Sequence, residues 1–267
     1  MVSFASMHSP SPTLTWLLAL SAACAYAVPA LRIGETAARW ALAVAWALHA
    51  GSLAWGLLGT APHFGFATAL SVTAWLMLTV YGVEQQLYPR LRTRALLGLL
   101  GAAAVVLAAL FPGLPLQVNS SVWLPLHLAL GIASYGLFTA AVVHAALMNH
   151  AEKRIRLAAD DDSGIPLLAL ERLTFRFVGA GFWLLTATLL AGWLFGEALY
   201  GRAWRWDHKT IFSLLSWITF ATLLIGRARF GWRGRHAVHM LYAGALLLLL
   251  SYAGSRFVME VLLERFT

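Results

Sequence analysis

The chain has 267 residues, of which 60% are hydrophobic and 11% are charged, and its formal net charge is +8. Apolar runs of about twenty residues recur along it, and each could cross a hydrocarbon layer of ~30 Å. The composition excludes a soluble globular protein and predicts an all-α, polytopic membrane protein with a single membrane domain, residues 1–267. The single cysteine, Cys24, excludes a disulfide framework and a CxxCH heme-attachment motif.

About eight segments are predicted to cross the membrane as helices: 13–31, 37–59, 64–88, 95–111, 122–148, 175–199, 208–226 and 237–261. Fourteen of the 19 Lys and Arg residues fall on alternate connections between these segments, and five fall on the opposite side. The positive-inside rule therefore predicts that the richer side is cytoplasmic and that both termini lie outside. The basic charge is interpreted as a topology signal, so we expect membrane lipid and no nucleic acid as a partner.

Among the histidines of the predicted segments, depth singles out two, His49 in the second segment and His127 in the fifth. An ionisable side chain within the bilayer is costly unless it is paired or faces a cavity, so both are candidate functional residues. The difference in their depths is under about 8 Å at 1.5 Å per residue, so both could face one site in the outer half of the bundle. Two histidines opposed across a bundle can ligate heme iron. The alternative for either one is a hydrogen bond between helices.

Small residues predict close helix packing in the second half of the chain. Gly131 and Ser134 follow His127 at i+4 and i+7, and Gly192 and Gly196 repeat at a spacing of four. The longest connection, 149–174, is predicted to be a cytoplasmic loop that is too short to form a domain.

A polar island, Ala203–Lys209, separates the sixth and seventh segments on the predicted outer side. Trp204, Trp206 and Asp207 could form an aromatic platform for a planar macrocycle. The cationic side chains of Arg202, Arg205 and Lys209 could then contact its propionate carboxylates. The alternative is an ordinary interfacial belt of tryptophans among headgroup-facing charges.

The island and its flanks resemble the tryptophan-rich WWD signature of the cytochrome c assembly family, the CcsA/CcmC-type heme-handling membrane proteins. The resemblance covers residues 120–260, and in overall shape the chain is most similar to the YpjD/HemX-type branch. The stretches that carry the resemblance are Trp204–Lys209 with Ser213–Trp217, Trp123–His127 with Ser134–Tyr135, Leu170–Leu173 leading into Gly181–Phe182, and Gly231–Arg235.

The resemblance implies that heme, b-type and non-covalently held, is presented on the tryptophan-rich loop at the outer membrane face with histidines as axial ligands. His127 matches the histidine before that loop. The family's second flanking histidine is absent from this chain, so His49 is the leading candidate for the second ligand and His208 is the reserve. Other cytochrome c assembly components are the implied partners.

The expected function is heme handling for cytochrome c assembly in a bacterial inner membrane. No nucleophile–base pair, phosphate loop or carboxylate dyad is present in the sequence, so we do not expect the chain to be an enzyme. A second hypothesis is a regulatory or structural membrane partner of heme biosynthesis that holds no heme. A third is a transporter of heme or a divalent cation, which the scarcity of acidic residues inside the helices disfavours.

Overall fold

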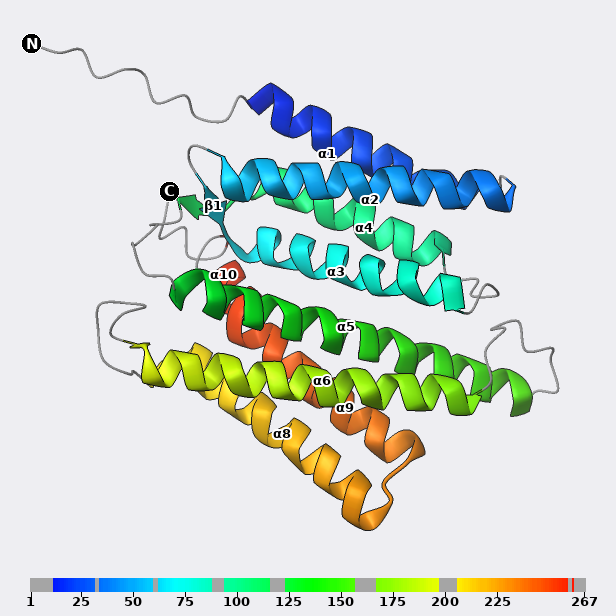
Figure 1. Cartoon of the computed structure of the whole chain (residues 1–267), viewed down its shortest axis with the longest axis vertical. Coiled ribbons are helices and arrows are strands. Elements are labelled where there is room, and N and C mark those ends of the chain that lie inside the picture. The colour runs from blue at the N-terminus through cyan, green and yellow to red at the C-terminus, as the bar shows by residue number, and fades with distance from the viewer. Residues whose placement is uncertain are drawn as a thin grey trace, which may run out of the picture. The chain divides into compact units, whose positions relative to one another are not determined.

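The computed structural model describes residues 12–31, 34–59, 62–87, 94–115, 123–156, 167–196, 206–258 and 261. The described chain is almost entirely helical, as Figure 1 shows. Its main helices are α1 (Pro12–Ala27), α2 (Glu35–Leu58), α3 (Phe66–Leu87), α4 (Arg94–Leu110), α5 (Trp123–Arg156), α6 (Leu167–Leu194), α8 (His208–Phe230) and α9 (Gly234–Leu249).

Short elements complete the described fold. A 3₁₀ turn, η1 (Val28–Leu31), extends α1, while a π-helical segment, η2 (Leu250–Gly254), and a short helix, α10 (Ser255–Phe257), extend α9. The strands β1 (His63–Phe64) and β2 (Leu114–Pro115) pair antiparallel, with His63 opposite Pro115 and Phe64 opposite Leu114. Neither the strand pair nor the π-helical segment was predicted, since two-residue strands carry no alternating pattern.

The helical membrane bundle predicted from the sequence is confirmed. Each of the eight predicted segments is helical over most of its length, and seven described helices are long and apolar enough to cross a membrane. The eighth apolar helix, Ala95–Leu110, is shorter. Large side chains such as Trp40, Trp183 and Leu58 are exposed on these helices, as expected of surfaces that face lipid.

The predicted loop 149–174 is wrong at both ends. Helix α5 continues to Arg156, and α6 already begins at Leu167. The prediction ended each helix where the apolar run ended, but a helix needs lipid-compatible side chains only inside the bilayer. Outside the bilayer, charged residues such as Lys153 are good helix formers, and the helix continues through them.

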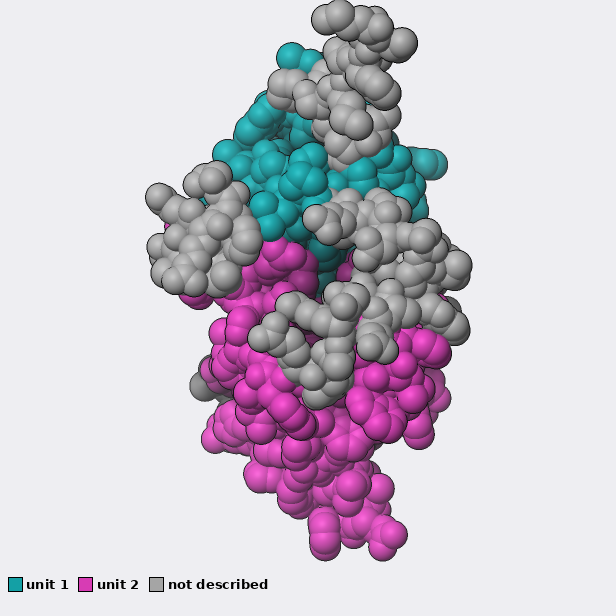
Figure 2. All heavy atoms as spheres, turned by 90° about the vertical axis from the view of Figure 1, so that its left-hand side faces the viewer, with its two compact units in different colours: residues 1–78, 93–117, 266 teal, residues 79–92, 118–265, 267 magenta. Residues whose placement is uncertain are grey.

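The helices pack in two compact units, coloured separately in Figure 2. Unit 1 consists of residues 1–78 and 93–117 with Phe266, and unit 2 consists of residues 79–92 and 118–265 with Thr267. In unit 1, α1 and α4 pack through the fully buried side chains of Ala19, Ala22 and Val105. The single membrane domain expected from the sequence stays a prediction.

The core of unit 2 is built around two stacked aromatic rings. The rings of Phe138 on α5 and Phe220 on α8 lie 3.8 Å apart and nearly parallel. Glycines make the necessary room, since a Cβ at Gly181 would lie 3.2 Å from the Phe138 ring and one at Gly244 would lie 2.8 Å from the Phe220 ring. Hydroxyls of Ser134 and Ser216 donate to the carbonyls of these same two glycines, at 3.2 and 2.8 Å.

Candidate functional site

Four helix ends meet at one end of unit 2. The beginnings of α5 and α8 lie beside the end of α6 and the end of the α9–η2–α10 helix, because these helices alternate in direction (Figure 1). Trp206 and Asp207 lead into α8 at this point, so we call it the tryptophan end. Trp204 of the predicted platform lies outside the described residues, as do Arg202 and Arg205, two of the predicted propionate contacts.

His127 lies in the second turn of α5, at the tryptophan end, with its ring against α6. Its ring hydrogen-bonds the backbone of Thr188, and a Cβ at Gly192 would lie 3.4 Å from its ring carbon Cε1. The buried Nδ1 atom of this ring makes no hydrogen bond within the described residues. Gly192 therefore provides the space in which the imidazole sits.

The small-residue stripe predicted on α5 does face α6. A Cβ at Gly131 would lie 3.5 Å from the Thr188 methyl carbon, and one turn further on Ser134 bonds the Gly181 carbonyl. The i+4 and i+7 spacing from His127 thus placed three residues correctly on one helix face.

Asp207 caps the N-terminus of α8. Its backbone is extended, and its Oδ1 accepts a hydrogen bond of 2.9 Å from the Thr210 backbone N–H. Partial burial raises the pKa of the Asp207 carboxyl, but the hydrogen bonds from Thr210 and the charges of Lys209 and His208 together hold it below its ordinary value. The carboxylate of the predicted platform therefore also has a structural role.

Trp206 and His208 flank this cap and are open to their surroundings. The indole of Trp206 is 69% exposed, and His208, the first residue of α8, is exposed as well. Both are therefore accessible to a ligand that approaches the membrane surface at this end.

Two cations approach one aromatic ring at the same end. The Lys209 Nζ lies 5.6 Å from the centroid of the Tyr252 ring, and the Arg256 guanidinium carbon lies 5.9 Å from it. Tyr252 belongs to the π-helical segment η2, a type of distortion that is often found at functional sites. Neither Tyr252 nor Arg256 was predicted as a site residue from the sequence, although their i+4 spacing at the end of the last helix could have linked them.

His49 is held in unit 1 by a chain of hydrogen bonds. Its Nδ1 lies 3.1 Å from the Tyr26 hydroxyl and its Nε2 lies 2.8 Å from the Ser71 hydroxyl, so the chain joins α1, α2 and α3. All three side chains are buried. Both imidazole nitrogens are engaged, which fits the alternative prediction of a hydrogen bond between helices; ligation of iron by His49 would require one of these bonds to break.

Within the described part of the chain, no group of three or more His, Cys, Asp or Glu side chains is arranged to hold a metal ion. The candidate site is therefore a surface of aromatic, imidazole and cationic groups at the tryptophan end.

The chain belongs to the cytochrome c assembly protein family. The family's model matches residues 35–263, a range that begins well before the family-like core 120–260 predicted from the sequence. No solved structure matches the chain.

Named relatives agree with this assignment. An uncharacterized 28.8 kDa protein of Azospirillum brasilense is 32% identical over 94% of this chain and 97% of its own length. The cytochrome c biogenesis protein CcsA of Trieres chinensis is 26% identical over 76% of this chain and 77% of its own. The inner membrane protein YpjD of Escherichia coli K12 is 32% identical over 51% of this chain and 52% of its own.

Proposed function

We propose that this chain binds heme non-covalently at the outer face of a bacterial inner membrane and handles it during cytochrome c assembly. The family and the CcsA relative support the link to cytochrome c biogenesis, and the YpjD relative supports the inner membrane. Other cytochrome c assembly components are the proposed partners. The proposed role is binding and presentation of heme, without catalysis by the chain itself.

One observation carries the proposal: an imidazole, an exposed indole and two cations lie at the tryptophan end of unit 2. His127, Trp206, Lys209 and Arg256 come from α5, the approach to α8, α8 itself and α10. These groups match the parts of heme, because imidazole ligates iron, an indole face stacks on a macrocycle, and cations pair with propionates. Trp204 and Asp207 remain part of the proposed platform, and Arg205 remains a proposed contact of a propionate.

His127 is the proposed first axial ligand. For the second ligand, His208 lies at the same end of the same unit, whereas His49 is hydrogen-bonded on both nitrogens within unit 1. The pairing of His49 with His127 expected from the sequence stays a prediction, and His208 is the candidate that needs no internal hydrogen bond to break.

The test is the absorption spectrum of the detergent-purified chain, oxidised and reduced, followed by titration with hemin. We expect a Soret band with bis-histidine character. His127→Ala should weaken this band and lower the affinity for hemin at least about tenfold, as expected for loss of a metal ligand or its support. His208→Ala and His49→Ala identify the second ligand. His239→Ala, an exposed histidine of α9, is the matched control and should leave the band unchanged.

A colourless protein that also fails to bind added hemin would rule out the proposal. In that case, capture of a soluble heme-biosynthesis enzyme by the pigment-free chain would favour the regulatory alternative. Equal losses in His127→Ala and His239→Ala would show that the band reports adventitious hemin in the detergent micelle.

A further inference from the structure

The turn between α8 and α9, taken with its flanking helix ends as residues 227–235, is fixed by several contacts; we call it the basic turn. Gly231 ends α8 in the left-handed conformation with φ 64°, which favours glycine, and the Trp232 N–H donates to the Gly226 carbonyl at 3.3 Å. The Trp232 ring lies flat on Gly226, where any Cβ would overlap it, and meets His236 edge-on at 4.5 Å. The arginines of this turn are therefore held on a fixed backbone.

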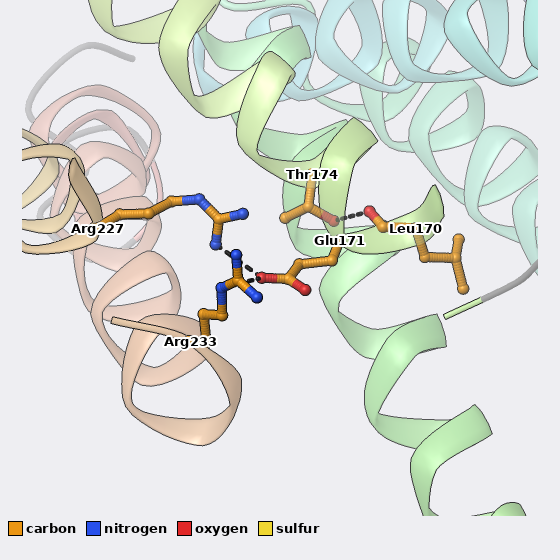
Figure 3. A network of polar contacts seen from close by, with 5 residues as sticks. All are labelled: Leu170, Glu171, Thr174, Arg227 and Arg233. Atoms are coloured by element: carbon orange, nitrogen blue, oxygen red, sulfur yellow. Dashed lines mark hydrogen bonds and ion pairs between the residues drawn. The ribbon is translucent and has the colours of Figure 1, made fainter. Parts of the chain in front are cut away.

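A single carboxylate anchors the turn to α6 (Figure 3). Arg227 Nη1 donates to Glu171 Oε1 at 2.8 Å, and its guanidinium stacks 3.7 Å above the centroid of the Phe175 ring. Arg233 Nε lies 3.8 Å from the same oxygen, with 70% of its side chain exposed. Arg227 thus makes the short contact with Glu171, and most of the Arg233 side chain remains exposed for contacts outside the protein.

The remaining arginines of the turn point away from the packed core. Arg229 and Arg235 are both exposed, and neither is ion-paired with a described acidic residue. Phe230, between them in the chain, is 73% exposed, and its ring lies 6.4 Å from that of Trp232. Three arginines with exposed side chains and an exposed aromatic ring therefore lie in the short stretch where α8 ends and α9 begins.

We propose that the basic turn binds the phosphate headgroups of anionic phospholipids. Guanidinium groups bind phosphate oxygens in pairs, and basic clusters beside membrane helices attract anionic lipid. The aromatic rings of Phe230 and Trp232 suit the boundary between acyl chains and headgroups. The site lies at the far end of α8 from the tryptophan end, and it operates whether or not heme is bound.

The test compares two double variants of the full chain purified in an uncharged detergent. Arg229→Gln with Arg235→Gln removes two arginines of the turn that do not contact Glu171, so the anchoring network stays intact. Arg172→Gln with Arg176→Gln, two exposed arginines of α6, is the matched control. Binding of phosphatidylglycerol is measured by native mass spectrometry, with zwitterionic phosphatidylcholine as the reference lipid of zero net charge and inorganic phosphate as a competitor.

We expect the turn variant to lose about tenfold or more in phosphatidylglycerol affinity, and the α6 variant to lose less than about threefold. The double variant Arg229→Lys with Arg235→Lys keeps the charge and loses the paired geometry. Its phosphatidylglycerol affinity should lie between those of the wild type and the glutamine variant. If the glutamine variant fails to fold, the lysine variant replaces it in the comparison.

Three outcomes would overturn the proposal. One is equal affinity for phosphatidylglycerol and phosphatidylcholine. Another is an equal loss in the turn and α6 variants, which would mean that general charge attracts the lipid. The third is displacement of the lipid by millimolar inorganic phosphate, which would mean that the turn recognises a free anion.

Discussion

At the scale of single residues, the polar side chains inside the helices are defined by their partners. His49 bridges Tyr26 and Ser71, Ser134 and Ser216 bond glycine carbonyls on neighbouring helices, and the Trp217 Nε1 donates to the Thr186 hydroxyl at 2.8 Å. In a bilayer these groups have no water to replace a lost partner, so each bond fixes the rotation of one helix against another. His49 therefore links three helices of unit 1, α1, α2 and α3, through hydrogen bonds.

The contribution of the His49 hydrogen bonds to stability can be tested without substituting the histidine itself. Ser71→Ala and Tyr26→Phe each leave one buried ring nitrogen without its partner, so each should lower the free energy of unfolding by about 1–3 kcal/mol. Because both act through the same ring, their effects should not add in the double variant. The measurement is the unfolding midpoint of the purified protein in a denaturing-detergent titration.

Thr73→Ala is the control for this prediction, because the Thr73 hydroxyl bonds only the Ala69 carbonyl of its own helix. It should change the unfolding free energy by less than about 0.5 kcal/mol. An effect of Ser71→Ala no larger than that of Thr73→Ala would show that the His49 bond contributes nothing to stability.

At the scale of elements, glycines determine how closely the helices of unit 2 approach. The stacked rings of Phe138 and Phe220 occupy the space that a Cβ would need on α6 and on α9. This pattern is the membrane form of close packing, in which small residues on one helix admit a large ring from its neighbour.

Alanine at Gly244 should therefore be damaging, since its Cβ would lie 2.8 Å from the Phe220 ring, and alanine at Gly181 less so, at 3.2 Å from Phe138. We expect losses of about 1–3 kcal/mol for Gly244→Ala and a smaller loss for Gly181→Ala. Gly179, on the same helix α6, has nothing within 4 Å of its Cβ position. Gly179→Ala should thus be neutral or stabilising by up to about 1 kcal/mol.

Thermal unfolding of the three purified glycine variants in one detergent measures the expected order of their stability losses. If Gly179→Ala is as destabilising as Gly244→Ala, helix packing is not limited by the ring stack.

The positions of the helices could largely be predicted from the sequence, and the features that could not be predicted have physical reasons. Apolar runs located every described membrane helix, and the spacing from His127 to Gly131 and Ser134 placed one helix face correctly. The ends of α5 and α6 were wrong because hydropathy marks the bilayer boundary, while helix propensity continues beyond it. The contact of Tyr26 and Ser71 with His49, and of Lys209 and Arg256 with Tyr252, depends on which helices are neighbours in space, which periodicity within one helix does not report.

At the scale of the whole molecule, charge rather than packing predicts the orientation in the membrane. The basic turn and the basic residues near the connection of α5 and α6 belong to the arginine-rich side, and the tryptophan end belongs to the other. The expected orientation, with both termini outside, therefore also predicts that the candidate heme site faces outward.

The orientation can be measured by cysteine labelling, because Cys24 is the chain's one cysteine. In a Cys24→Ser background, Ser3→Cys and Thr267→Cys should react in intact cells with a membrane-impermeant maleimide. Ser163→Cys, between α5 and α6, should react only after the membrane is permeabilised. The reverse pattern would place the tryptophan end in the cytoplasm and contradict heme presentation at the outer face.

The ion pair of Glu171 with Arg227 has a consequence for biosynthesis. The two residues are 56 positions apart, and α8 leaves the ribosome well after α6. The Glu171 carboxylate, near the start of α6 on the predicted cytoplasmic side, therefore gains its partner Arg227 only when α8 and its following turn have been made. Formation of this pair marks the point at which α8 has docked on α6, which makes it a late step in the assembly of unit 2.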